Sequence, residues 1–129
     1  MSFNVPSLIV MAAGISGGLG VALGAFGAHG LRGRVEERLL ETFQTAVQYQ
    51  IIHTLALLIV AIMMLQSGRN LTLDIAAGAF VVGIFLFSGS LYGLVLTDMR
   101  WLGPVTPLGG LCFIAGWAAL VAAGLQQLN

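Results

Sequence analysis

Polar side chains that can bind a ligand or move a proton cluster near the ends of long apolar segments. Eight of them are candidates for a polar pocket: His29, Tyr49, Gln50, His53, Ser90, Tyr92, Asp98 and Thr106. Imidazole, phenol, hydroxyl, amide and carboxylate groups can exchange hydrogen bonds with a polar ligand or with one another. Consecutive antiparallel helices would bring these positions to the same side of a membrane, so we expect a single pocket there.

His53 is the most informative of these residues. On a helix continued from Val35 it falls on the side facing away from a stripe of Glu and Gln, which predicts that it points into the protein. An ionisable side chain inside a membrane is costly and marks a functional candidate. Alternatively, a neutral histidine joins helices by hydrogen bonds. His29 lies beside Gly30 at a segment end, where solvation is the simpler interpretation.

The two histidines do not predict a metal or haem site. Zinc generally takes four ligands, and no cysteine pair or carboxylate stands at ligand spacing. A bis-histidine haem needs more room than a glycine-tight bundle offers. Ser90 and Cys112 have no base nearby, and Asp98 beside Arg100 predicts an interfacial ion pair. We therefore predict no catalytic residue, no metal, no cofactor and no enzymatic activity.

The composition is that of an integral membrane protein. Of 129 residues, 58% are hydrophobic and 8% are charged, and the net charge is zero. Four apolar segments each reach the length of about 20 residues that a helix needs to cross a bilayer. We predict an all-α, single-domain, up-down bundle of four transmembrane helices. The expected spans are 8–29, 49–66, 75–97 and 105–125.

The segment 35–48 precedes the second span and is amphipathic. Placed on a helix, it carries Glu37 and Glu41 on one side and Leu39 and Phe43 on the other. It either lies on the membrane surface or extends the second span, and the pattern fits both. The second span has few small residues, which predicts that it faces lipid more than its neighbours do.

Small residues recur every three or four positions in the other spans. The first span carries one stripe at Ala13, Gly17, Gly20, Gly24 and Gly27, and a second at Gly14, Gly18, Ala22, Ala25 and His29. Such stripes let helix backbones approach closely, so we expect this span to be the hub of the bundle, contacted on two sides. We expect Gly20 and Gly24 to lie against a neighbouring backbone. Gly83, Gly93 and Gly116 are predicted to serve helix packing in the later spans.

The arginines predict the orientation in the membrane. Arg32, Arg34, Arg38 and Arg100 flank one side of the expected spans, and only Arg69 flanks the other. Basic residues favour the cytoplasmic side. Loops 30–48 and 98–104 are therefore predicted to be cytoplasmic, and both termini outside.

Four motifs carry a resemblance to a known family. They are GAFGAHGL at 24–31, FQTAVQYQ at 43–50 followed by His53, LFSGSLY at 86–92, and TPLGG at 106–110 with Gly116 and Trp117. In this order they resemble the YgdD-like family of small bacterial inner-membrane proteins, which is similar to the eukaryotic transmembrane protein 256. Thr54 departs from the alanine expected there. The resemblance implies four spans in the inner membrane and no established activity.

Two classes of function are compatible with these features. The first is a structural or accessory subunit that forms a compact bundle or binds a membrane partner. The second is a small transporter, proton relay or lipid-binding protein with a cytoplasm-facing pocket around His53. The apolar far halves of the spans favour the first. The expected partners are the lipid bilayer and either a second copy of the chain or another membrane protein, and not nucleic acid.

Overall fold

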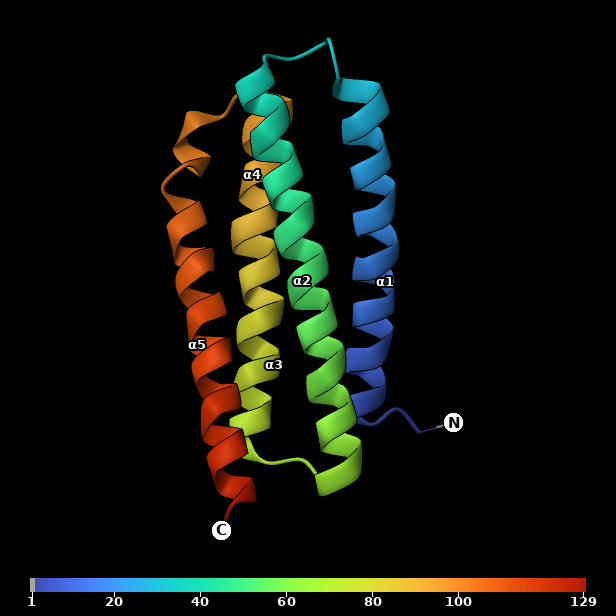
Figure 1. Ribbon diagram of the computed structural model, residues 1–129, viewed down its shortest axis with the longest axis vertical. Coiled ribbons are helices and arrows are strands. Elements are labelled where there is room, and N and C mark those ends of the chain that lie inside the picture. The colour runs from blue at the N-terminus through green and yellow to red at the C-terminus, as the bar shows by residue number, and fades with distance from the viewer. Residues whose placement is uncertain (1) are drawn as a thin grey trace.

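The computed structural model describes residues 2–129 and arranges them as four antiparallel helical rods (Figure 1). The elements are α1 (Val5–Ala25), η1 (Phe26–Leu31), α2 (Glu37–Ser67), α3 (Leu71–Gly83), η2 (Ile84–Gly89), α4 (Ser90–Thr97), η3 (Arg100–Leu102) and α5 (Val105–Gln127). Within the described residues no strand occurs, and four helical stretches are long and apolar enough to cross a membrane. This confirms the all-α, four-span prediction. Both chain ends lie at the same end of the bundle.

Three of the rods depart from a single regular helix. The first rod ends in the π-helical turn η1, and the third passes through the π-helical η2 between α3 and α4. The fourth begins with the short 3-10 turn η3. Asparagine side chains cap the N-termini of α1 and α3. The Asn4 side chain accepts a hydrogen bond from the Ser7 amide at 2.9 Å, and the Asn70 side chain accepts one from the Leu73 amide at 3.0 Å.

The amphipathic segment is the first part of α2 and not a separate surface helix. α2 runs without interruption from Glu37 to Ser67, and Leu40, Phe43 and Ala46 in its first three turns are buried. Glu41 is exposed, as the amphipathic pattern requires. The structure thus settles the choice that the sequence leaves open, and it carries α2 well beyond the predicted span.

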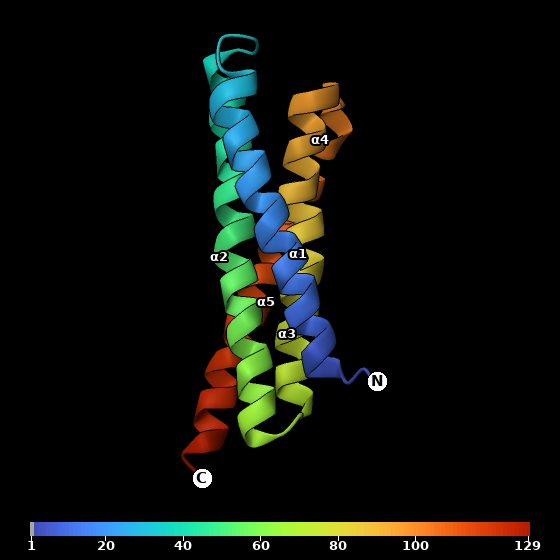
Figure 2. The ribbon, with the colours of Figure 1, turned by 90° about the vertical axis from the view of Figure 1, so that its right-hand side faces the viewer.

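The hub of the bundle is α2, which corrects two predictions. The buried share of its apolar window is 44%, against 17% for the first span, so α2 faces lipid less than its neighbours and α1 is the peripheral rod. α1 packs mainly on α2, whereas α2 also contacts α3, η2 and α4 (Figure 2). A close approach needs small residues on only one of two helices, so the glycine-rich rod need not be the central one.

Bulky side chains of α2 pack against the small residues of α1. Phe43 packs against Gly27, Val47 against Gly24 and Ile51 against Gly20. A Cβ atom at Gly20 would lie 2.9 Å from a side-chain carbon of Ile51, and at Gly24 3.3 Å from Val47. The expected contact with a neighbouring backbone is therefore wrong at both positions. A Cβ atom at Gly17 would lie 3.7 Å from the methyl carbon of Thr54.

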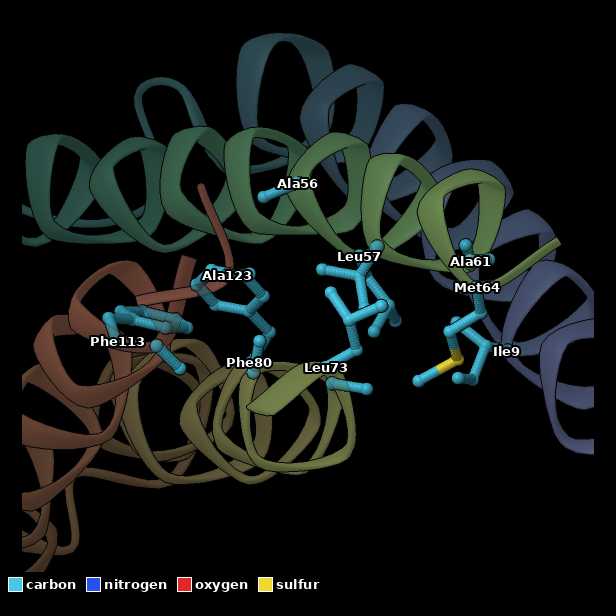
Figure 3. Packing of buried hydrophobic residues seen from close by; sticks show 14 residues of the cluster. Ile9, Ala56, Leu57, Ala61, Met64, Leu73, Phe80, Phe113 and Ala123 are labelled. Carbon is cyan, nitrogen blue, oxygen red and sulfur yellow. The ribbon is translucent and has the colours of Figure 1, made fainter. Parts of the chain in front are cut away.

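Glycines on the other rods receive aromatic rings. Gly83 lies against the ring of Phe113, and Gly116 against that of Phe80, so α3 and α5 exchange phenylalanines across their interface. Gly93 faces Leu102 in η3. The main apolar core extends from this interface towards α1; its labelled members are Ile9, Ala56, Leu57, Ala61, Met64, Leu73, Phe80, Phe113 and Ala123 (Figure 3).

Candidate functional site

The eight pocket candidates do not share one pocket, which corrects the prediction of a single site. His53 lies between α2 and α5, whereas Gln50 and Tyr92 meet between α2 and α4. Ser90 and Thr106 form a third group. Two residues three positions apart on a helix differ in direction by about 60° around its axis. His53 and Gln50 therefore point towards different neighbours of α2.

His53 is held from three sides inside the bundle. Its side chain is buried, with 4% of the residue exposed. The imidazole stacks on Phe113 with ring centroids 3.5 Å apart and an interplanar angle of 7°. Tyr49, 39% exposed at the lipid face, has its ring centroid 5.8 Å from that of His53, 6.3 Å from that of Phe113 and 4.6 Å from that of Phe87. The ring thus ties α2 to α5 through an aromatic stack.

The hydrogen bonds of His53 define one tautomer. Nδ1 lies 2.8 Å from the carbonyl oxygen of Tyr49, which can only accept, so Nδ1 carries the proton. Trp117 Nε1–H donates to Nε2 at 3.1 Å, so Nε2 is unprotonated. The neutral imidazole therefore satisfies both contacts. With both nitrogens engaged, this arrangement matches a histidine that fastens helices together.

Gln50 connects three helices on a neighbouring face of α2. Its Nε2 donates to the Ser16 carbonyl oxygen on α1 at 2.8 Å, and its Oε1 accepts from the Tyr92 hydroxyl on α4 at 2.6 Å. The hydroxyls of Ser16 and Thr54 lie 2.7 Å apart and extend the link between α1 and α2. Thr54, the departure from the family pattern, thus takes part in helix packing.

Replacing Gln50 by Leu should destabilise the bundle by about 1–2 kcal/mol, because the Ser16 carbonyl and the Tyr92 hydroxyl lose their partner inside the protein. Unfolding by sodium dodecyl sulfate titration measures this loss. Gln48→Leu is the matched control, since Gln48 is exposed on the same helix. Equal stability of the Gln50 and Gln48 variants would show that the link contributes nothing.

Two serines around η2 accommodate its wider turn. Ser88 is fully buried and donates to the Ala46 carbonyl at 2.7 Å, which joins η2 to α2. Ser90 donates to the Phe87 carbonyl at 2.9 Å and pairs with Thr106 at 2.6 Å, which joins α4 to α5. Side chains of this kind compensate irregular backbone within a membrane. π-Helical turns often occur at functional sites.

The remaining charged and titratable candidates lie on the surface. His29 is exposed in η1, and Asp98 is exposed where it ends α4 in the left-handed conformation, with φ 57°. Among the described residues Asp98 and Arg100 form no ion pair, which corrects that prediction, since Asp98 closes one helix and Arg100 opens the next. At the opposite end Asp74 accepts from Arg69 at 2.7 Å, and this hydrogen bond together with the carboxylate charge raises the pKa of Arg69.

Several polar contacts in the structure have no signal in the sequence. Ser16 and Trp117 supply partners to Gln50 and His53, and Ser88 anchors η2. Trp117 stands in a quoted motif, but its partner lies 64 positions away in the chain. Helical spacing places Ser16 at the edge of the first small-residue stripe of α1, next to Leu23 on the aliphatic face, without showing what it contacts. Over residues 2–129 no three His, Cys, Asp or Glu side chains lie together as a metal site would require.

Comparison with known proteins places these features in a family. A family model described as a protein of unknown function, DUF423, matches residues 23–110. The UPF0382 membrane protein YwdK of Bacillus subtilis is 43% identical over 85% of this chain and 89% of its own length. A UPF0382 membrane protein of Haemophilus influenzae is 41% identical over 88% of this chain and 90% of its own. A Staphylococcus aureus relative is 40% identical over 90% and 93%. No solved structure gives a significant match.

Proposed function

Because this chain belongs to the DUF423 family of multi-pass membrane proteins, whose function is unknown, we propose that it is a structural or accessory subunit that binds a transmembrane helix of another membrane protein. The binding face is the outer side of α1. No catalytic step is part of this proposal, in line with the sequence, in which neither Ser90 nor Cys112 has a base nearby.

The observation that carries the proposal is the unused small-residue stripe of α1. The stripe at Gly17, Gly20 and Gly24 packs on α2, but a Cβ atom at Gly14 or Gly18 would meet no atom within 4 Å. Gly14, Gly18 and the exposed Ala22 repeat at four-residue spacing, which is the pattern that lets a second transmembrane helix approach closely. α1 is also the least buried of the four spans.

The polar side chains inside the bundle support this function further. Among residues 2–129, every fully buried side-chain nitrogen and oxygen has a hydrogen-bond partner within the chain. The groups that could serve transport or proton transfer, above all His53 and Gln50, are engaged in joining helices. A bundle built in this way favours stable presentation of a surface over chemistry in its interior.

The proposal also includes the membrane location, the orientation and the wider family of the protein. The family resemblance supports a location in the inner membrane, and the arginine distribution supports an orientation with loops 30–48 and 98–104 in the cytoplasm and both termini outside. The four motifs support a relationship to YgdD-like proteins and to the eukaryotic transmembrane protein 256. A second copy of the chain is the competing partner for the outer face of α1.

Photocrosslinking tests the partner. With benzoylphenylalanine in place of Gly18, we expect a discrete crosslinked protein band from native membranes, whose composition mass spectrometry identifies. The same probe at Ile114, which is 65% exposed on α5, should yield no such band. Adding Gly14→Leu should reduce the Gly18 crosslink at least fivefold at unchanged thermal stability, because Gly14 has open space around it.

Crosslinks to lipid alone at both positions would overturn the proposed function. A band with the mass of two chains would instead assign the face to a second copy. Carbonate-resistant membrane fractions are the starting material, so that only partners embedded in the bilayer are compared.

A further inference from the structure

An elongated crevice separates α1 from the third rod, and α2 forms its floor. Its volume is about 410 Å³. In Figure 2, α1 crosses α2 obliquely and leans away from α4 at the upper end. We call the crevice the α1–α4 crevice. Its lining includes Ile15, Leu19, Gln50, Phe85, Ser88 and Tyr92.

The dimensions of the crevice limit what can occupy it. It extends at least from Ala12 to Leu23, which at 1.5 Å per residue is about 16 Å along α1. A helical segment of that length with its side chains is about 10 Å across and occupies about 1,300 Å³, several times the volume of the crevice. The crevice is therefore too small for a helix of a second copy and fits a single hydrocarbon chain.

The chemistry of the lining also favours hydrocarbon. Aliphatic and aromatic side chains such as Ile15, Leu19 and Phe85 form the two walls. The polar residues on the floor are occupied: Gln50 bonds to Ser16 and Tyr92, and Ser88 donates to Ala46. No buried side-chain polar atom within residues 2–129 lacks a partner, so the crevice contains no unpaired polar group that requires a polar ligand.

The position of the crevice indicates how it is filled. It opens sideways between two rods that span the membrane, and the surrounding medium at that depth is lipid. An empty apolar crevice would forfeit the dispersion contacts of its walls. Because α1 packs mainly on α2, a chain lying in the crevice would be its principal contact with the third rod.

We propose that the α1–α4 crevice binds one acyl chain of a membrane phospholipid, which connects α1 to η2 and α4 and remains with the protein when it is extracted from the bilayer. The lipid enters from the side, between α1 and the third rod. This site is distinct from the outer face of α1, where Gly14 and Gly18 point elsewhere.

Native mass spectrometry tests the proposal on the full chain, reconstituted with palmitoyl-oleoyl-phosphatidylethanolamine and released in mild detergent. We expect one retained phospholipid per chain. Gly89→Leu fills the crevice from η2, where only the Ile84 carbonyl lies within 4.0 Å, and should lower the lipid-bound fraction at least fivefold. Ala12→Leu fills it from α1 and should act alike, which covers the case that one variant fails to fold.

Gly18→Leu is the matched control, since it adds the same side chain to α1 outside the crevice, in open space. It should keep the lipid even where it loses the proposed protein partner, so the two proposals can fail independently. Retention of the lipid by both filling variants, or no retained lipid in the unsubstituted protein, would overturn the assignment. A lipid-free dimer would overturn it as well, in favour of a second copy.

Discussion

Changing Gly109 to Ala should destabilise the bundle by about 3 kcal/mol or more, a large effect for the addition of one methyl group. A Cβ atom at this position would lie 2.7 Å from the carbonyl carbon of Leu86 and closer still to the amide nitrogen of Phe87. Both atoms belong to the backbone of η2, so no side-chain rotation relieves the overlap. α5 must then move away from η2, which also loosens the contact between Phe113 and Gly83.

The neighbouring glycine provides the control for this experiment. A Cβ atom at Gly110 would lie 4.0 Å from the Phe87 ring, which is an ordinary contact. Alanine is also a better helix former than glycine, so Gly110→Ala should be neutral or slightly stabilising. Denaturation in dodecyl sulfate and thermal unfolding in mild micelles measure both variants. Similar stability of the two would mean that η2 and α5 do not approach as closely as described.

The fold follows from the sequence because lipid leaves few alternatives. Apolar segments of about 20 residues must be helical in a bilayer, and short connections such as that around Asn70 force antiparallel neighbours. The central helix could not be identified in this way. The glycines of α1 show where a backbone can be approached, but the bulky partners Phe43, Val47 and Ile51 determine which helix is surrounded.

The candidate site was harder to predict than the fold. The position of a residue along a span gives its approximate depth in the membrane, but His53 contacts Trp117 and Ser90 contacts Thr106, eleven residues apart along α5, so these two side chains do not lie at one level. Their direction around the helix decides which residues meet, and that depends on how α2 is rotated between its neighbours. The π-helical turns η1 and η2 also change which side of the first and third rods faces α2. No residue pattern in the sequence marks these turns.

Replacing His53 by Ala should destabilise the protein by about 3 kcal/mol, comparable to the loss of a buried aromatic side chain. The variant removes the stack on Phe113 and leaves a cavity between α2 and α5. It also leaves Trp117 Nε1–H without its acceptor in an apolar setting. Ile52→Ala is the control on the same turn of α2, since Ile52 is 42% exposed at the lipid face.

A double-mutant cycle separates the hydrogen bond from the packing. Trp117→Phe keeps an aromatic ring but removes the donor, and should cost about 1 kcal/mol on its own. In the His53→Ala background that cost should largely vanish, because the acceptor is already gone, giving a coupling energy of about 1 kcal/mol. Strict additivity would mean that the indole gains nothing from the imidazole. His53 would then hold α5 through its stack on Phe113 alone.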